Sequence, residues 1–287
     1  MYSMSKLKYT FKNDILFKMV FVKYPELLKR LVADLLKIRF ESIEEFVITN
    51  PEMAPENIGR KFCRLDINMI VNNQRVDLEI QVGNEGDYPE RSVFYWAREY
   101  STAIAEGDSY TKLPRTIAIS ILGFTLFACD EYYSEFELRE VTRNTRLTDK
   151  MSMQYYELAK LPRWVNPQTG LELWLTLFNC ETEEDLARLE NLEEPIMEKA
   201  IGAYRQVSAT AEFLEIERLR SKARHDEAQA LENARRKAYR KAEEKWQSVI
   251  ADKDSVIANK DSVIADKDAE NEQLRRQLAE LQAKLGN

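Results

Sequence analysis

The sequence predicts an α/β fold, in which a mixed sheet flanked by helices is followed by a long helical coiled-coil tail. Residues 61–82 alternate between apolar and polar side chains around Asn72-Asn73, which is the pattern of a β-hairpin. Residues 116–127 form a continuous apolar run with β-branched side chains, as a buried central strand does. From residue 248 onward a motif recurs with a period of seven residues, which predicts a coiled coil.

The remaining segments alternate between helical and strand-like patterns. The pattern predicts helices over residues 9–39, a strand or lead-in over 40–49, a loop over 51–60, a helix over 90–106, strands over 136–141 and 151–158, and helices over 171–178, 183–192 and 196–207. The helix over 90–106 is expected to bury Val93, Trp96, Ala97, Tyr100 and Ile104. These elements divide the chain into a domain over 1–207, a charged helical connector over 208–247 and a coiled coil over 248–287.

Each strand of the hairpin has one apolar and one polar face. The apolar faces comprise Cys63, Leu65, Ile67, Met69, Val71, Val76, Leu78, Ile80 and Val82, and the polar faces comprise Arg64, Asp66, Asn68, Arg75, Asp77, Glu79 and Gln81. A slip by one residue would expose an apolar face, so opposed residues share a face. A loop at Asn72-Asn73 places Asp66 opposite Glu79, and a loop at Asn73-Gln74 places Asp66 opposite Gln81. Either register brings Asp66, Glu79 and Gln81 within about 5–8 Å of one another.

The closeness of Asp66 and Glu79 has two interpretations. Two carboxylates repel each other unless a cation compensates their charge. Hard oxygen ligands suit Mg²⁺ or Mn²⁺, and the main-chain carbonyl of Ile80 would complete such a metal site. Alternatively, the acids belong to the solvated polar face of an amphipathic hairpin. Periodicity alone leaves both interpretations open.

Seven segments occur in the order found in a known protein family: residues 11–18 (FKNDILFK), 65–66 (LD), 77–81 (DLEIQ), 91–98 (RSVFYWAR), 107–114 (GDSYTKLP), 117–122 (IAISIL) and 156–160 (YELAK). In these segments the chain resembles the recombination-promoting nuclease (Rpn) family, also called PD-(D/E)xK nuclease family transposases. The resemblance extends over roughly residues 8–200. It implies a restriction-endonuclease-like core and metal-dependent DNA cleavage associated with recombination or mobile elements.

The resemblance also implies roles for individual residues. Asp66 and Glu79 would hold the metal, and Gln81 would orient the attacking water. Many nucleases of the superfamily have Lys where this chain has Gln81, although Gln is usual in the Rpn family. Gln lacks the charge that would stabilise a developing phosphorane. Asp14 would assist from the first helix, unless it is simply the N-cap of that helix.

Composition excludes several other chemistries. His225 is the only histidine, which excludes Ser-His and Cys-His triads and His-rich zinc sites. The three cysteines (Cys63, Cys129 and Cys180) are widely spaced, which predicts a reducing cytoplasm rather than a disulfide framework, and Cys63 is expected in the core. The sequence contains no run of 18 apolar residues, so it predicts no membrane-spanning helix. The net charge of −7 argues modestly against tight DNA binding.

Some arginines and tyrosines have two interpretations. Arg91 and Arg98 lie on nearly the same helical face, where they contact phosphate or pair with nearby acids such as Glu90. Tyr95 and Tyr110 are expected in the core or at its rim, with substrate contact as the alternative.

The tail repeats the motif SVIA(D/N)KD three times. With Ile250 at heptad position a, that position also holds Ile257, Ile264, Asn271, Leu278 and Leu285, and position d holds Lys253, Lys260, Lys267, Leu274 and Leu281. Asn271 at position a favours a parallel homodimer, because the two amides satisfy each other in that register. The alternative is a lone helix with an exposed apolar stripe. The basic patch over residues 235–241 contacts DNA or is a solvated surface.

Three functions fit these observations. The leading hypothesis is a metal-dependent DNA endonuclease that dimerises through its tail and cuts opposite strands. The second is a catalytically weak or inactive DNA-binding or recruitment module, which the missing Lys and the acidic charge favour. The third is a coiled-coil assembly protein whose partner is another protein.

Overall fold

The computed structural model describes residues 5–50, 66–84, 86–162, 164 and 167–285. Contacts divide the chain into two compact units, residues 1–221 and 222–287. The first unit extends beyond residue 207 because Phe213 and Ile216 of the following helix are buried in its core. The three-part division suggested by the sequence stays a prediction.

The first unit is built on a six-stranded mixed sheet with the strand order β1-β2-β3-β4-β6-β5. Its strands are β1 (Phe46–Ile48), β2 (Ile67–Val71), β3 (Gln74–Gln81), β4 (Thr116–Leu122), β5 (Tyr133–Phe136) and β6 (Met151–Glu157). β3, β4 and β6 run parallel, whereas β1, β2 and β5 pair antiparallel with their neighbours. The predicted mixed sheet is confirmed.

The hairpin of β2 and β3 has the two-residue loop at Asn72-Asn73. Both residues have positive φ, 47° and 58°, as a type I′ turn requires and as Asn tolerates. Ile67 therefore pairs with Leu78. The described part of the predicted apolar face is buried, comprising Ile67, Met69, Val71, Val76, Leu78 and Ile80. Val82 is an exception, because it lies beyond the end of β3 and is 55% exposed.

Cys63, Leu65 and the predicted loop over 51–60 lie outside the described residues.

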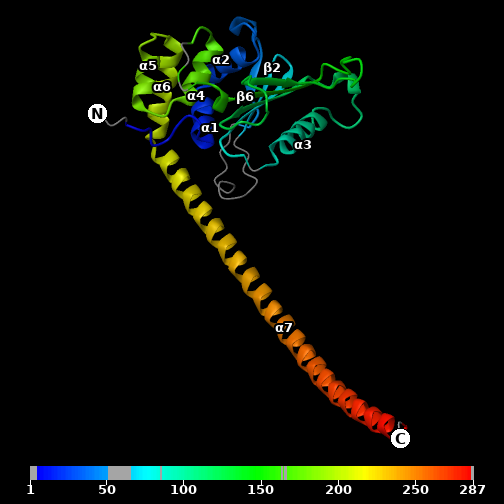
Figure 1. Ribbon diagram of the computed structural model, residues 1–287. Helices are drawn as coiled ribbons and strands as arrows, with labels where there is room; N and C mark the ends of the chain where they lie inside the picture. Colours follow the sequence, from blue (N-terminus) through cyan, green and yellow to red (C-terminus); the bar gives the residue numbers. More distant parts are fainter. Residues whose placement is uncertain (1–4, 51–65, 85, 163, 165–166, 286–287) are drawn as a thin grey trace. The chain divides into compact units, whose positions relative to one another are not determined.

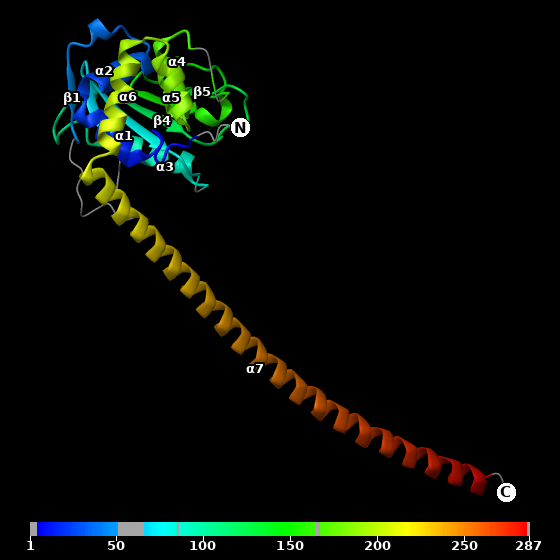
Figure 2. The same ribbon diagram turned by 90° about the vertical axis from the view of Figure 1, so that its left-hand side faces the viewer.

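Helices cover both faces of the sheet (Figures 1 and 2). The larger group comprises α1 (Asp14–Lys23), α2 (Pro25–Leu35), α4 (Gly170–Asn179), α5 (Glu183–Glu190) and α6 (Pro195–Ser208). This group packs on the face that carries Leu78, Ile119 and Ile121. α3 (Tyr88–Ser101) lies on the opposite face, against Ala118, Met153 and Tyr155. The unit is therefore layered as helices, sheet and helix.

Local signals determine where these helices begin. Asn13 caps α1 by accepting the N–H of Leu16. Thr169 and Thr182 each form a capping box with the acidic residue three positions later. Proline occupies one of the first two helical positions in α2, α3 and α6, where its missing N–H costs little.

α3 buries a different stripe from the predicted one. Tyr88, Ser92 and Trp96 face the sheet at intervals of four residues, whereas Val93 and Ala97 are exposed. The helix also begins and ends earlier than the predicted range 90–106. Hydrophobicity was a poor guide because the buried stripe contains a serine, Ser92, whose hydroxyl lies 2.8 Å from the hydroxyl of Tyr155.

The strand predicted over residues 136–141 is wrong, because β5 is Tyr133–Phe136. The following residues form an exposed loop in which Glu137 pairs with Arg139 and Arg146, at 2.5 and 2.8 Å. Val141 in this loop is 99% exposed, so the alternating apolar residues that predicted a strand over 136–141 do not pack against the core. β4 is buried at every position, as predicted, although it ends at Leu122 rather than at residue 127.

The second unit is formed by most of α7, a single helix over Ala211–Leu285. Its apolar heptad side chains are exposed, including Ile250, Ile257, Ile264, Leu274, Leu278 and Leu281. Exposed apolar surface is unfavourable by roughly 25 cal/mol per Å². Within the described residues, no helix is long and apolar enough to cross a membrane.

Gly170 begins α4 directly against Asp34 of α2. A Cβ atom at residue 170 would lie 2.6 Å from both carboxylate oxygens of Asp34. Asp34 Oδ2 accepts a hydrogen bond from Nε1–H of the buried Trp174 at 3.0 Å. We expect Gly170→Ala to displace Asp34, leave the indole N–H unsatisfied, and lower the free energy of unfolding by about 1–3 kcal/mol.

Denaturant unfolding measures this effect, with Gly202→Ala in α6 as the control. Among the described residues, no atom beyond the chain neighbours of Gly202 and the adjacent backbone of α6 lies within 4 Å of a Cβ at this position. Alanine there should therefore stabilise the protein by about 0.5–1 kcal/mol. Equal effects of the two substitutions would contradict the packing argument.

Candidate active site

The polar face of the hairpin turns toward α3 and carries the acids that the sequence singled out. Asp66 directly precedes Ile67, and Ile67 pairs with Leu78, so Asp66 lies opposite Glu79. Asp66 is buried, and Asp77, Glu79 and Gln81 on the same face of β3 are half-buried. The hairpin therefore places Asp66 and Glu79 across from each other, in one of the two registers compatible with the sequence.

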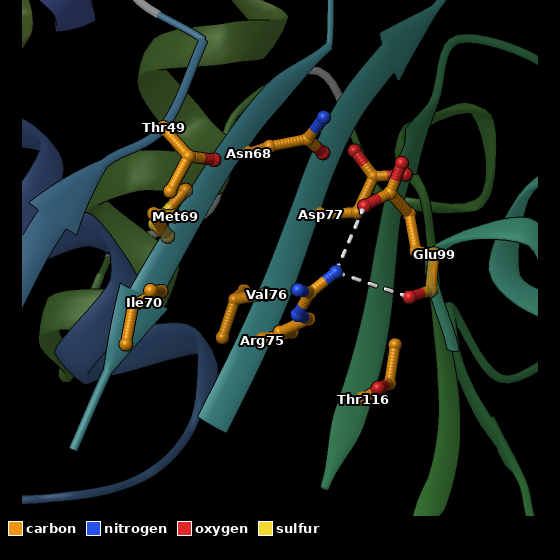
Figure 3. Close-up of a pocket in the computed structure, with 9 residues that line it drawn as sticks. All are labelled: Thr49, Asn68, Met69, Ile70, Arg75, Val76, Asp77, Glu99 and Thr116. Carbon is orange, nitrogen blue, oxygen red and sulfur yellow. Dashed lines mark hydrogen bonds and ion pairs between the residues drawn. The ribbon is translucent and has the colours of Figure 1, made fainter. Parts of the chain in front are cut away.

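Asn68 lies between two of these acids. With its amide nitrogen turned toward them, Asn68 donates to Asp77 Oδ1 at 2.8 Å and to Asp66 Oδ2 at 3.2 Å. Figure 3 shows Asn68 and Asp77 side by side on neighbouring strands. The amide thus holds the Asp66 and Asp77 carboxylates in a defined position.

Arg75 and Glu99 occupy the same side of the sheet below Asp77 (Figure 3). Arg75 Nη1 donates to the main-chain oxygen of Glu99 at 3.2 Å and lies 3.9 Å from its carboxylate. These contacts attach the last turns of α3 to β3.

Glu79 is held by a tyrosine that sequence reasoning missed. Tyr88, the first residue of α3, donates its hydroxyl to Glu79 Oε2 at 3.1 Å and is only 1% exposed. Burial, and next the Glu79 carboxylate, raise the pKa of Tyr88 well above its usual value. The phenol therefore stays protonated and remains a hydrogen-bond donor. The spacing of four residues between Tyr88, Ser92 and Trp96 was the signal in the sequence that could have placed Tyr88 on the buried face of α3.

Two residues on β4 and β6 extend this network. Ser120 lies beside Glu79 in the parallel register of β3 and β4, and it hydrogen-bonds to Tyr88. Tyr155 of β6 lies next to Ser120 in register, and its hydroxyl is 2.8 Å from Ser92 Oγ. Burial raises the pKa of Tyr155. The wall behind Glu79 is thus made of neutral hydroxyl groups.

Gln81 lies two residues after Glu79 on the same face. Its Nε2 donates to the main-chain oxygen of Gly83 at 3.0 Å. This contact orients the side chain so that Oε1 is the atom left to accept a hydrogen bond.

Asp14 makes a contact that neither sequence interpretation anticipated. Asn13, not Asp14, caps α1. The Asp14 carboxylate accepts two hydrogen bonds from the Arg220 guanidinium of α7, one of them 2.7 Å long. Asn13 also donates to Glu217 of α7 at 3.0 Å. These contacts attach the start of α7 to the first turn of α1, and a catalytic role for Asp14 stays a prediction.

The model of one protein family, the PD-(D/E)XK nuclease family transposases, matches residues 11–234. The chain belongs to this family. The suspected Rpn relationship is thereby confirmed, and the match extends into α7 beyond the resemblance recognised in the sequence. No curated protein and no solved structure matched the chain.

Membership in the PD-(D/E)XK family identifies a nuclease fold linked to transposition, and it implies DNA as the substrate. Nucleases of this family generally use divalent metal ions. Among the described residues, no three His, Cys, Asp or Glu side chains converge as a complete metal site. Two carboxylates with a main-chain carbonyl and water still suit Mg²⁺, which commonly keeps several waters.

The main-chain carbonyl of Ile80 fits this donor set. Along β3, the N–H of Arg75 donates to Arg115, just before β4, and the main-chain oxygen of Gln81 accepts from Gly123, just after β4, so both groups face the β4 side. Backbone groups alternate sides along a strand. The carbonyl of Ile80 therefore points toward β2, the strand that Asp66 precedes.

Proposed function

We propose that the chain is a Mg²⁺- or Mn²⁺-dependent DNA endonuclease in which Asp66, Glu79 and the Ile80 carbonyl hold the metal. The observation that carries this proposal is the placement of Asp66 opposite Glu79, with Gln81 next on the same face. The bound ion would act as a Lewis acid on the phosphodiester and lower the pKa of its water. The family match supports nuclease chemistry.

The surrounding side chains have supporting roles in this proposal. Asn68 orients Asp66 by donating to its carboxylate, and Tyr88 orients Glu79 in the same way. Gln81 Oε1 accepts a hydrogen bond from the attacking water, because the amide nitrogen of Gln81 already donates to Gly83. Gln81 orients the water without stabilising negative charge in the transition state.

The experiment that tests the proposal is plasmid cleavage with Mg²⁺, Mn²⁺, Ca²⁺ or EDTA. Cleavage that requires metal and disappears in Asp66 and Glu79 variants supports it. Absence of cleavage by a folded parent favours the second candidate, a DNA-binding or recruitment module that retains the nuclease fold. The neutral Gln81 and the net charge of −7 favour this second candidate.

We also propose that α7 forms a homodimeric coiled coil. Its exposed apolar residues recur at positions a and d from Ile250 to Leu281. Trp246 and Tyr239, both more than 60% exposed, continue position d toward the N-terminus of the helix. A second copy of the same helix would cover this stripe, and it would bring two nuclease units together for cuts on opposite strands.

Tyr88→Phe is expected to weaken Mn²⁺ affinity by about 10–100-fold, because Glu79 would lose the hydroxyl that orients it. Calorimetric titration of metal into the protein measures this without DNA. The matched control is Tyr155→Phe, which removes a buried hydroxyl from the same cluster but leaves the Tyr88–Glu79 contact in place. Equal affinities in the two variants would contradict the role of Tyr88.

A further inference from the structure

A polar groove lies where β3 and β4 begin, at the other end of these strands from Glu79 and Gln81. The groove has a volume of about 470 Å³ and is bordered by the Asn72-Asn73 turn and by Lys112, Arg115, Asp149 and Lys150. Three of these side chains are cationic and one is anionic, in a chain whose net charge is −7. The side chains that line the groove therefore carry more positive than negative charge, whereas Asp108 and Glu135 lie just outside the lining.

The cations of the groove are available to a ligand. Lys112 pairs with Asp108 at 2.9 Å, but the Lys112 side chain is 67% exposed, and such a surface pair contributes little stability. Within the described part of the chain, Lys150 has no ion pair. Both side chains can therefore turn toward an anion at little cost.

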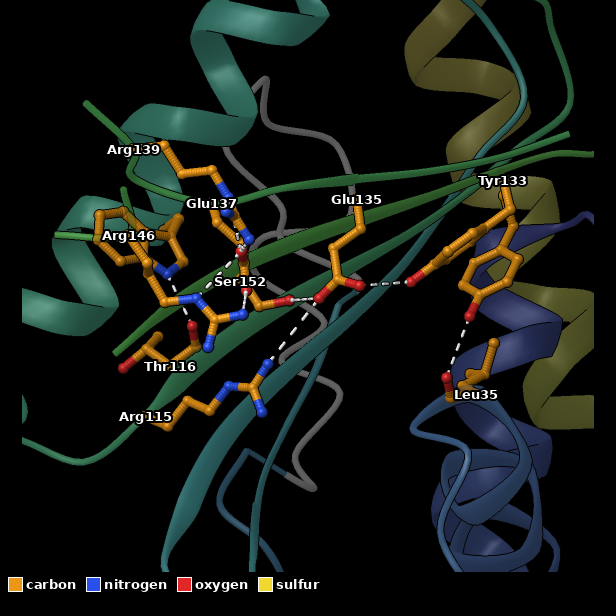
Figure 4. Close-up of polar contacts among 11 residues, drawn as sticks. Leu35, Arg115, Thr116, Tyr133, Glu135, Glu137, Arg139, Arg146 and Ser152 are labelled. Atoms are coloured by element: carbon orange, nitrogen blue, oxygen red, sulfur yellow. Dashed lines mark hydrogen bonds and ion pairs between the residues drawn. The ribbon is translucent and has the colours of Figure 1, made fainter. Parts of the chain in front are cut away.

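Arg115 is also incompletely satisfied. Its nearest carboxylate, Glu135, is 3.8 Å away and already accepts hydrogen bonds from Ser152 at 2.7 Å and Tyr133 at 2.9 Å (Figure 4). Among the described residues, no acceptor lies within hydrogen-bond distance of Arg115 Nε, although that atom is buried. The Arg115 side chain as a whole is 39% exposed, so its terminal nitrogens can contact a phosphate in the groove.

Residues 111–114 line one side of the groove, and the turn over residues 107–110 directly precedes them. Asp108 accepts the N–H of Ala105 at 3.1 Å, and Ser109 Oγ lies 2.8 Å from Thr111 Oγ1. Gly107 has φ of 89°, which the turn requires. These contacts order an exposed turn and present Tyr110, whose ring is 82% exposed. The expectation that Tyr110 lies in the core or at its rim is therefore wrong.

We propose that this groove binds an unpaired DNA strand, with Lys112, Arg115 and Lys150 on its phosphates and Tyr110 stacked on a base. Cations that follow the backbone, combined with an exposed aromatic ring, are the common means of binding single strands. The proposal rests on the proposed function, because it concerns the same DNA substrate. Gln74 borders the groove and Glu79 lies five residues further along β3, about 17 Å away. The bound strand would therefore have to span about 17 Å between the groove and the cleavage site.

The test is fluorescence anisotropy in EDTA, with a labelled single strand of about 20 nucleotides and a blunt duplex of the same sequence. Lys112→Gln/Lys150→Gln should reduce the slope of log affinity against log salt by about 1.4, because two phosphate contacts are lost. Tyr110→Ala should weaken single-strand binding by about 5–100-fold and leave duplex binding unchanged. Lys23→Gln/Lys199→Gln is the charge-matched control, and both of these lysines are exposed.

Two results would overturn the proposal. One is an equal change of the salt slope in the groove variant and in the control variant. The other is single-strand affinity that Tyr110→Ala leaves unchanged. Because the assay contains EDTA, it is independent of cleavage. If the parent never cleaves DNA but the groove variants lose DNA affinity, the groove proposal stands and the proposed catalysis is wrong. If the parent cleaves DNA but the groove variants keep their DNA affinity, only the groove proposal is wrong.

Discussion

The Asp66→Asn and Glu79→Gln substitutions are each expected to lower the rate of metal-dependent plasmid cleavage by about 10²–10³-fold or more. Each substitution preserves the size of the side chain and removes one negative charge from the pair across the hairpin. Without metal, both variants should be at least as stable as the parent, because the repulsion between the carboxylates is relieved. Metal should raise the melting temperature of the parent and have little effect on either variant.

Asp77→Asn is the matched control for these variants. Asp77 lies on the same face of β3, next to Asn68, but is not among the proposed metal ligands. Its loss of charge should reduce cleavage by less than about tenfold, through the orientation of Asn68 and Asp66 alone. Asp66→Asn or Glu79→Gln protein that cuts DNA as well as the parent would exclude the proposed mechanism.

Deletion of residues 239–287 is expected to convert a dimer into a monomer with an intact nuclease unit. The deletion removes the exposed apolar residues of α7 from Tyr239 onward. It retains Phe213, Glu217 and Arg220, which pack on or bond to the N-terminal part of the first unit. Light scattering should show the molar mass falling from two chains to one. Nicking should persist, whereas cuts on both strands should become rare.

A point variant separates loss of pairing from loss of length. Ile257→Asp/Ile264→Asp retains the full helix but places charges at two a positions, which should prevent association. Lys253→Leu/Lys260→Leu/Lys267→Leu should strengthen it, because lysine at position d weakens the apolar seam. A parent that is monomeric at every concentration would rule out the homodimer.

Much of the fold follows from signals that are local in the sequence. Asn72-Asn73 tolerates the positive φ of a tight turn, and the period of two on either side allows only registers that keep one face apolar. Asp66, Glu79 and Gln81 consequently share a face in any allowed register. The continuous apolar run from residue 116 required burial on both faces, which β4 has. Helical periodicity located the ends of the described helices to within about five residues.

The tertiary structure decided what depends on residues far apart in the chain. Periodicity alone does not predict which side chains contact Glu79. In the structure, α3 places Tyr88 and β4 places Ser120 beside it. Asp14 and Arg220 meet although 206 positions separate them. Strand β5 was misplaced because short strands take their limits from the neighbour they pair with, here β6, rather than from their own alternation. The sequence by itself therefore determined the hairpin and its acidic face, whereas packing determined which side chains orient those acids.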